Sequence, residues 1–297
     1  MRRIDAGRWL KTCTTPATRP EPLMRRSSAY TRAVSPVARA GDTVAMWATP
    51  TFYLEVGIQS SVGAMSDRVC AVTGVGPGTG AALVRRFAAE GYRVAMLART
   101  AERLDQLARS IPGARAYAAD VADEAAVRDV FARIRSDLGP VETLLYNAGS
   151  GVFAPFLDTP PDAFQAAWRV NALGLLLCSR EVVPAMLEAG HGSILVTGAT
   201  ASLRGGANFA AFAPAKAAQR VLAQSMARSL GPRGIHVAYV IVDGVIDIPN
   251  TRAFLGDRPD DFFLKPDAIA ETFWQVVRQD RSAWTFELDV RPFGERW

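Results

Sequence analysis

The chain has 297 residues, of which 49% are hydrophobic, enough for one large α/β domain with or without an appendage. Its formal net charge is +5, but nine basic residues and only four acidic ones fall within residues 1–64, so residues 65–297 are electrically balanced. This distribution argues against a nucleic-acid-binding surface on the body of the protein.

Cysteine and histidine usage is sparse. The three cysteines, Cys13, Cys70 and Cys178, are odd in number and widely spaced, and the only histidines are His191 and His236. This pattern predicts reduced thiols in a cytoplasmic protein and no metal site. No run of about 18 uninterrupted apolar residues is present, so we predict neither a membrane-spanning segment nor a membrane partner.

Residues 1–64 lack a sustained hydrophobic period and are interrupted by five prolines. Three interpretations are open. The segment is a disordered or mis-assigned extension with Met65 as the working start, an interaction arm, or an organelle-targeting leader in the Arg/Ser/Thr-rich residues 1–40. The sequence favours the first of these.

From Met65 onward, apolar runs alternate with segments of helical period. Predicted strands cover residues 68–73, 92–98, 114–119, 141–147, 191–198, 235–242 and 283–290. Predicted helices cover residues 79–91, 100–111, 123–138, 162–189, 208–230 and 266–279. Alternation of this kind produces parallel βαβ units with right-handed crossovers. We therefore predict one α/β domain over residues 65–297, a Rossmann-type doubly wound sheet of seven parallel strands.

A glycine-rich turn joins the first strand to the first helix. Glycines at this junction allow a sharp turn and close approach of the backbone to a pyrophosphate, which the positive end of the helix dipole attracts. The expected contacts come from Thr73, Gly74, Gly76, Gly78, Thr79 and Gly80.

The end of the second strand indicates which cofactor is bound. A carboxylate there would favour the ribose 2′-hydroxyl of NAD, whereas a cation favours a 2′-phosphate. The strand ends Leu97-Ala98-Arg99-Thr100, with no carboxylate and with an arginine whose planar fork suits a phosphate. The sequence therefore favours NADP(H).

Over Met65 to about Val290 the chain resembles the short-chain dehydrogenase/reductase superfamily. The run TGVGPGTG at 73–80 is similar to the family's TGxxxGxG, and four further landmarks follow in order. The resemblance implies that Asp120 and Val121 lie at the adenine and that Asn147-Ala148-Gly149 ends the fourth strand beside the cofactor. It also implies that Asn171 positions a water on a proton relay and that Lys216 binds the nicotinamide ribose.

Two departures from the family pattern affect the chemistry. The family's active-site tyrosine, four residues before the lysine, corresponds to Phe212, and its serine corresponds to Ala199. The alternative tyrosine spacing of enoyl reductases falls on Phe209. After the sixth strand the family's Pro-Gly is Asp243-Gly244, with Gly244 expected at the cofactor, and the threonine expected beyond it is Ile248.

These departures leave three functions open. In the family the phenol protonates the alkoxide that hydride transfer creates, and the serine steadies the carbonyl oxygen, so ordinary alcohol dehydrogenation is not expected. The first function is an atypical oxidoreductase, similar to relatives that reduce conjugated C=C bonds without the tyrosine. The second is an NADP(H)-binding pseudoenzyme that acts as sensor or scaffold, and the third is a structural partner without cofactor.

Candidate replacements for the missing proton donor lie near the expected site. They are Thr200, Ser202, Tyr146 and Asp243, together with a water held by Asn171 and Lys216. The substrate is expected to be a small molecule, and the aromatic residues within 249–265, the segment that usually covers the substrate in the family, favour an apolar one. Family habit also implies a homodimer or homotetramer packed through residues 162–189 and 208–230.

Overall fold

The computed structural model describes residues 67–295, which belong to the second of the two units into which the chain divides, Gln59–Trp297. The predictions for residues 1–64 lie outside the described residues. The predicted domain over residues 65–297 is described from residue 67 to residue 295. Seven parallel strands form one sheet in the order β3-β2-β1-β4-β5-β6-β9. The strands are β1 (Val69–Thr73), β2 (Arg93–Ala98), β3 (Ala114–Ala118), β4 (Val141–Tyr146), β5 (Gly192–Ala199), β6 (Ile235–Val242) and β9 (Glu287–Val290).

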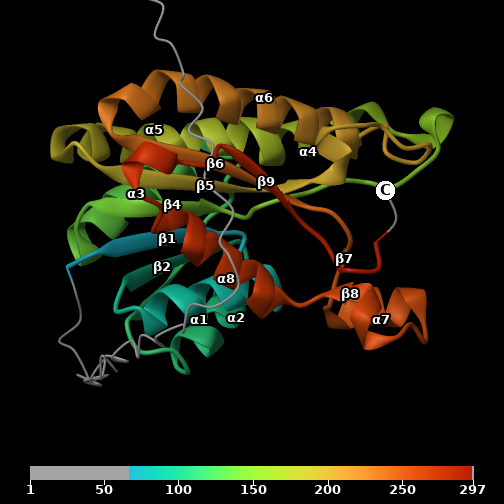
Figure 1. Ribbon diagram of the computed structural model, residues 1–297, viewed down its shortest axis with the longest axis horizontal. Coiled ribbons are helices and arrows are strands. Elements are labelled where there is room, and N and C mark those ends of the chain that lie inside the picture. The colour runs from blue at the N-terminus through green and yellow to red at the C-terminus, as the bar shows by residue number, and fades with distance from the viewer. Residues whose placement is uncertain (1–66, 296–297) are drawn as a thin grey trace, which may run out of the picture. The chain divides into compact units, whose positions relative to one another are not determined.

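Helices cover both faces of the sheet (Figure 1). One core lies under α3 (Glu124–Leu138), α5 (Gly174–Ala189) and α6 (Phe212–Leu230). The other lies under α1 (Thr79–Ala89), α2 (Ala101–Ala108) and α8 (Pro266–Val277). The predicted Rossmann-type doubly wound sheet of seven strands is confirmed.

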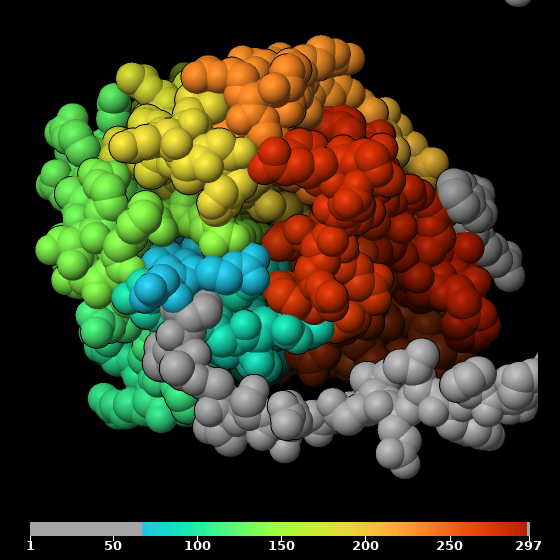
Figure 2. Space-filling model, turned by 60° about the vertical axis from the view of Figure 1, so that its left-hand side comes forward, coloured from blue at the N-terminus to red at the C-terminus, as the bar shows by residue number. Residues whose placement is uncertain are grey.

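The helix layer formed by α1, α2 and α8 joins segments that are far apart in the chain. The red α8 lies beside the teal α1 (Figures 1 and 2), and ion pairs link Arg86 to Glu271 at 2.6 Å and Arg85 to Asp267 at 2.9 Å. Burial of the apolar strands, such as all five residues of β1, provides the main stabilisation of this arrangement, because exposed ion pairs contribute little.

The predicted helix over residues 162–189 is continuous but irregular. It consists of α4 (Pro161–Trp168), a π-helical turn (Arg169–Leu173) and α5. It is the one helix among residues 67–295 that is long and apolar enough to cross a membrane, and half of its most apolar window is buried in the protein. Such burial is also found in core helices, so the finding is weak evidence for a membrane segment.

Two predicted elements begin four residues later in the structure, and regular structure follows β6 where none was predicted. Helix α6 begins at Phe212 rather than at residue 208, which places Pro214 in the first helical turn, where a missing N–H costs nothing. Strand β9 begins at Glu287 rather than at residue 283, because a 3₁₀ turn (Arg281–Ala283) precedes it. The segment after β6 contains a helix, α7 (Pro249–Leu255), and a two-stranded pairing of β7 (Val245–Ile246) with β8 (Phe263–Leu264).

The topology brings functional loops to one edge. Strand β1 lies between β2 and β4, so the chain reverses its direction of winding between β1 and β4. The loops that follow these two strands therefore diverge and leave a crevice at the carboxyl ends of the strands, where ligands bind in folds of this type.

Candidate functional site

Two adjoining cavities occupy the carboxyl edge of the sheet. The first, of about 240 Å³, is lined by Arg99 and Arg103 and is called here the arginine cavity. The second, of about 610 Å³, is lined by Lys216 and is called the lysine cavity. Both cavities are lined by Gly74, Gly76, Asn147, Gly149 and Ser150, so they form one continuous cleft.

The glycine turn after β1 is packed tightly against the loop after β4. Gly74 has a φ of +69°, and a Cβ there would lie 2.5 Å from Ala148 Cα. The Asn147 amide donates a hydrogen bond to the Gly74 carbonyl at 2.9 Å, and the Asn147 backbone N–H donates to the Thr73 hydroxyl at 3.2 Å. These contacts hold the turn in a shape that only glycine permits at position 74.

The same turn leads into the N-terminus of α1, which begins at Thr79 and has no side-chain cap at Gly78. An N-terminus of this kind presents backbone N–H groups and a positive dipole end to an anion. A Cβ at Gly80 would lie 2.6 Å from the Gly74 carbonyl oxygen, so the helix starts in direct contact with the turn. The geometry fits the pyrophosphate of a dinucleotide.

We expect Gly74→Ala to destabilise the domain by about 2–3 kcal/mol, because alanine would combine a left-handed backbone with a backbone clash. Urea unfolding followed by circular dichroism measures this change. The matched control is Gly76→Ala in the same turn, where an added Cβ meets nothing within 4 Å, so the free energy of unfolding should hardly change. Equal stability of the two variants would contradict the packing described for Gly74.

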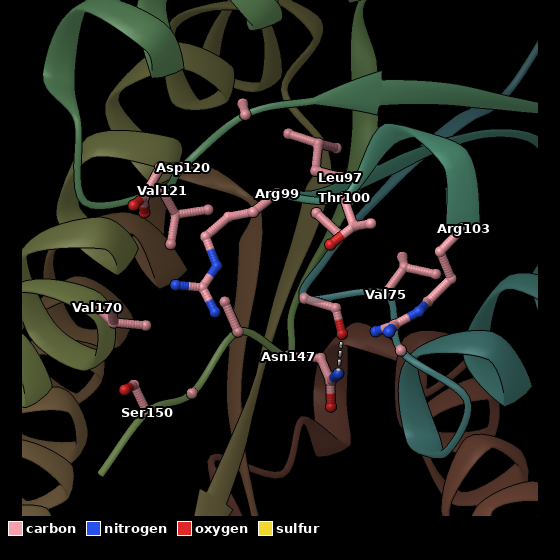
Figure 3. Close-up of a pocket in the computed structure, with 16 residues that line it drawn as sticks. Val75, Leu97, Arg99, Thr100, Arg103, Asp120, Val121, Asn147, Ser150 and Val170 are labelled. Atoms are coloured by element: carbon pink, nitrogen blue, oxygen red, sulfur yellow. Dashed lines mark hydrogen bonds between the residues drawn. The ribbon is translucent and has the colours of Figure 1, made fainter. Parts of the chain in front are cut away.

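The arginine cavity carries positive charge from two elements. Figure 3 shows the Arg99 guanidinium, from the end of β2, and the Arg103 guanidinium, from the first turn of α2, extending into the cavity. Asp120 and Val121 line it as well, and Asp120 Oδ1 accepts a hydrogen bond from the Ala122 N–H at 2.9 Å. Arg103 was not predicted from the sequence. The feature that could have indicated it is a second arginine in the first turn of the helix after β2.

Lys216 lies at the other end of the cleft and is only 5% exposed. Its Nζ donates to the Thr197 carbonyl at 2.9 Å and to Gln219 Oε1 at 3.0 Å. Nζ also lies 5.9 Å from the centre of the Phe212 ring. Burial lowers the pKa of Lys216 to about 7, since desolvation disfavours the charged amine.

Asn171 lies in the π-helical turn and is fully buried. Its Nδ2 donates to the Ser150 carbonyl at 2.6 Å and to the Ala167 carbonyl at 2.8 Å, whereas its buried Oδ1 has no hydrogen-bond partner. A Cβ built on Gly149 would lie 3.5 Å from Asn171 Oδ1 and 3.7 Å from Lys216 Nζ. One acceptor and one donor therefore flank the same small space, which suits a hydroxyl group or a water molecule.

Phe212 and Ala199 both line the lysine cavity, and Phe209 does not. The Phe212 ring makes edge-to-face contacts with Phe153 at 5.3 Å and with Phe209 at 6.1 Å between ring centres. A Cβ at Gly151 would lie 2.5 Å from the Phe212 ring, so the glycine permits this approach. The wall of the cavity beside Lys216 is apolar as a result.

Three hydroxyl groups singled out from the sequence are already engaged by protein partners. Thr200 donates to the Asp243 carboxylate, Ser202 donates to the Ala199 carbonyl at 2.7 Å, and the fully buried Tyr146 donates to the Val170 carbonyl. Burial also raises the pKa of Tyr146 well above its usual value. None of these three side chains lines either cavity.

The loop after β6 is fixed by the C-terminal segment. The Asp243 carboxylate lies 3.5 Å from Arg291 Nη1, and a Cβ at Gly244 would lie 2.8 Å from Pro292 Cδ. Gly244 lines the lysine cavity, whereas Asp243 faces Thr200 and Arg291.

The segment after this loop adds two more residues to the lysine cavity. Ile248 and Thr251 both line it. The Thr251 hydroxyl accepts from the Ile248 N–H at 3.2 Å and lies 2.5 Å from the Ile246 carbonyl. Sequence reasoning named Ile248 but not Thr251, because the irregular segment at 245–248 gives no periodic signal.

Within residues 67–295, no three His, Cys, Asp or Glu side chains gather as they would around a metal ion.

Comparison with known proteins gives a consistent picture. A family model described as short chain dehydrogenase matches residues 68–256. A short-chain dehydrogenase from Rhodopseudomonas palustris is 37% identical, with a TM-score of 0.67 over 77% of this chain and 100% of its own. A metagenomic short-chain oxidoreductase in complex with NADP is 27% identical, with a TM-score of 0.67 over 78% of this chain and 99% of its own.

A curated relative carries a different cofactor in its name. The 2-dehydro-3-deoxy-L-rhamnonate dehydrogenase (NAD(+)) of Sphingomonas sp. (strain SKA58) is 32% identical over 63% of this chain and 75% of its own length. The similar proteins thus include one named for NAD(+) and one in complex with NADP, so similarity alone does not distinguish the two cofactors for this chain.

Proposed function

The chain belongs to the short-chain dehydrogenase family, and on this premise we propose that it is an atypical NADP(H)-dependent oxidoreductase acting on a small apolar substrate. The observation that carries the proposal is the continuous cleft, with two arginines at one end and the buried Lys216 at the other. When bound, the nicotinamide supplies or accepts the hydride. The residues of the chain bind it, exclude water and move the proton.

Several residues support the cofactor assignment. The turn at 73–80 and the N-terminus of α1 would hold the pyrophosphate, while Asp120 and Val121 would line the adenine site. Arg99 and Arg103 would pair with a 2′-phosphate through charge-assisted hydrogen bonds. Asn147, Ala148, Gly149, Lys216 and Gly244 would surround the nicotinamide half.

The proton source is the unusual part of the proposal. Phe212 and Ala199 stand where the family has tyrosine and serine, and neither side chain can donate a proton. The small space on Gly149, between Lys216 Nζ and the unpartnered Asn171 Oδ1, is suited to a water that delivers the proton instead. The protonated Lys216 would also stabilise an enolate oxygen, which favours a conjugated C=C bond as the group reduced.

In such a reduction, the hydride adds to the β-carbon and the π electrons move to the carbonyl oxygen of the substrate. The water between Lys216 and Asn171 then protonates the α-carbon, and Lys216 returns a proton to the hydroxide that is left. The apolar wall formed by Phe153 and Phe212, which both line the lysine cavity, supports an apolar substrate.

One observation favours a second function, a pseudoenzyme that binds NADP(H) as a sensor or scaffold. The hydroxyls of Thr200, Ser202 and Tyr146 all donate to protein partners, and none of these side chains lines the cleft, so none of the three replaces the phenol. In that case the intact cofactor residues would serve binding alone.

We also propose that the chain assembles as a homodimer or homotetramer through α4, α5 and α6. These helices carry large apolar side chains that are exposed in the described protomer. They are Phe164, Trp168, Leu176 and Val221. Packing against a second copy would remove this apolar surface from water.

Calorimetric titration with NADPH and NADH, followed by assays with paired enones and ketones, tests the proposed function. We expect NADPH to bind at micromolar concentrations and more tightly than NADH, and enones to be reduced faster than the matched ketones. Tight NADPH binding with no turnover of either class would identify the pseudoenzyme. Failure of both cofactors to bind below millimolar concentration would refute the proposal as a whole.

A further inference from the structure

Gln219, one turn after Lys216 on α6, is fully buried and joins three parts of the site. Its Oε1 accepts from Lys216 Nζ at 3.0 Å and from the Tyr239 hydroxyl at 3.2 Å. Its Nε2 donates to the Asn171 carbonyl in the π-helical turn at 3.0 Å. A single neutral side chain thus connects Lys216, β6 and the helix that carries Asn171.

The surroundings of Lys216 supply acceptors but no counter-charge. The Thr197 carbonyl of β5 accepts a hydrogen bond from Lys216, and the neutral Asn171 of the π-helical turn lies nearby. The third neighbour is the phenol of Tyr239 on β6, whose pKa is raised by burial. The nearest turn of α6 carries Arg220, which is paired with Glu287 of β9 at 2.5 Å.

On the loop after β6, Asp243 is engaged by Thr200 and Arg291. No ion pair between Lys216 and an Asp or Glu exists within residues 67–295, and burial alone accounts for the low pKa of Lys216.

We propose that Gln219 is a positioning residue, whose neutral amide fixes the Lys216 amine beside the cleft and links it to the π-helical turn that carries Asn171, without supplying a counter-charge. A buried ammonium with two neutral acceptors is held in place but is poorly stabilised as a cation. An amide suits this task because it accepts from Lys216 and donates to the Asn171 carbonyl at the same time.

Two substitutions at position 219 separate positioning from packing. Gln219→Glu keeps the size of the side chain and adds an anion about 3 Å from Lys216 Nζ, which should raise the pKa of Lys216 by about 1–3 units. Gln219→Met keeps most of the buried volume but removes all three hydrogen bonds of the amide, including the one from Lys216, which should lower the pKa of Lys216 further. A residue that merely filled space would shift the pKa of Lys216 in neither variant.

The composition of the chain makes this test direct. It contains only three lysines, Lys11, Lys216 and Lys265, so protein labelled with ¹³C at the lysine ε-carbon gives three NMR signals. The Lys216 signal is identified by its loss in Lys216→Met. Titration of the cofactor-free full chain is expected to show Lys216 changing protonation near pH 7.

The inference would be overturned by a wild-type Lys216 signal that titrates near pH 10, or by Gln219→Glu and Gln219→Met titrating like wild type. If either variant fails to fold, as judged by circular dichroism, the wild-type titration still decides whether the amine is uncompensated, and the remaining variant decides the role of Gln219.

The inference rests on the proposed function only for the catalytic role of Lys216. The titration itself is done without cofactor and does not depend on that function. Failure of NADPH to bind would therefore refute the proposed function and leave the Gln219 result intact.

Discussion

Phe212→Tyr combined with Ala199→Ser is expected to raise the rate of NADPH-dependent ketone reduction by about 10²-fold or more. Both positions line the lysine cavity, and Lys216 Nζ lies 5.9 Å from the Phe212 ring centre. A phenol there would supply the general acid, which contributes about 10²–10⁴-fold, and the serine would donate to the developing oxyanion. Initial rates of NADPH oxidation with a panel of ketones measure the gain.

The matched control is Phe209→Tyr combined with Ala199→Ser, which tests the alternative tyrosine spacing. Phe209 does not line the lysine cavity, so this variant should show no comparable gain. A wild-type protein that already reduces ketones rapidly would contradict the proton-donor argument. A Phe212→Tyr/Ala199→Ser variant that binds NADPH normally and stays inactive would show that another obstacle exists.

Arg99→Ala combined with Arg103→Ala is expected to weaken NADPH binding by at least about 10²-fold while changing NADH binding little. A hydrogen bond to a charged group contributes about 1.5–3 kcal/mol, and each 1.4 kcal/mol is a factor of ten in affinity. Since NADH has no 2′-phosphate, it loses neither contact. Calorimetric titration of both cofactors measures the difference, which should shrink as the salt concentration rises.

Arg109→Ala is the control for lost positive charge, because Arg109 caps the far end of α2, is exposed and does not line the arginine cavity. It should bind both cofactors like the unchanged protein. If the Arg99→Ala/Arg103→Ala variant lost affinity equally for NADPH and NADH, the arginines would serve a general electrostatic role, and the preference for a 2′-phosphate would have to be abandoned.

The sequence was sufficient to predict the fold. Hydrophobic periodicity is a local property, and apolar runs such as residues 69–73 and 235–242 are buried along their whole length, as strands of a doubly wound sheet require. The glycine turn at 73–80 was also readable, because it occupies a fixed place between a strand and a helix. The predicted helix 208–230 is too long at its start, because Pro214 belongs in the first helical turn and α6 begins at Phe212.

Most of the predicted cofactor residues line the cleft; the glycine turn and Arg99 are predictable from their places at strand ends, whereas Asp120, Asn147 and Lys216 rest on the resemblance to the family. Asn147 and Gly149 follow β4 and Lys216 lies on α6; each is marked in the sequence by a family motif, and the topology brings the two segments to one edge. Residues without such a marker were missed. Arg103 lies on a helix, and Gln219 looks like an ordinary helical position in the sequence.

By itself, then, the sequence determined the order of strands and helices, the glycine turn and the residue types at Phe212 and Ala199. Only the tertiary structure decided that Phe212 rather than Phe209 faces Lys216, that Thr200 is held by Asp243, and that Gln219 joins Lys216 to Asn171. The physical reason is that backbone periodicity is encoded over a few neighbouring residues. The partner of a buried polar group is instead chosen by the packing of segments that lie tens of residues apart.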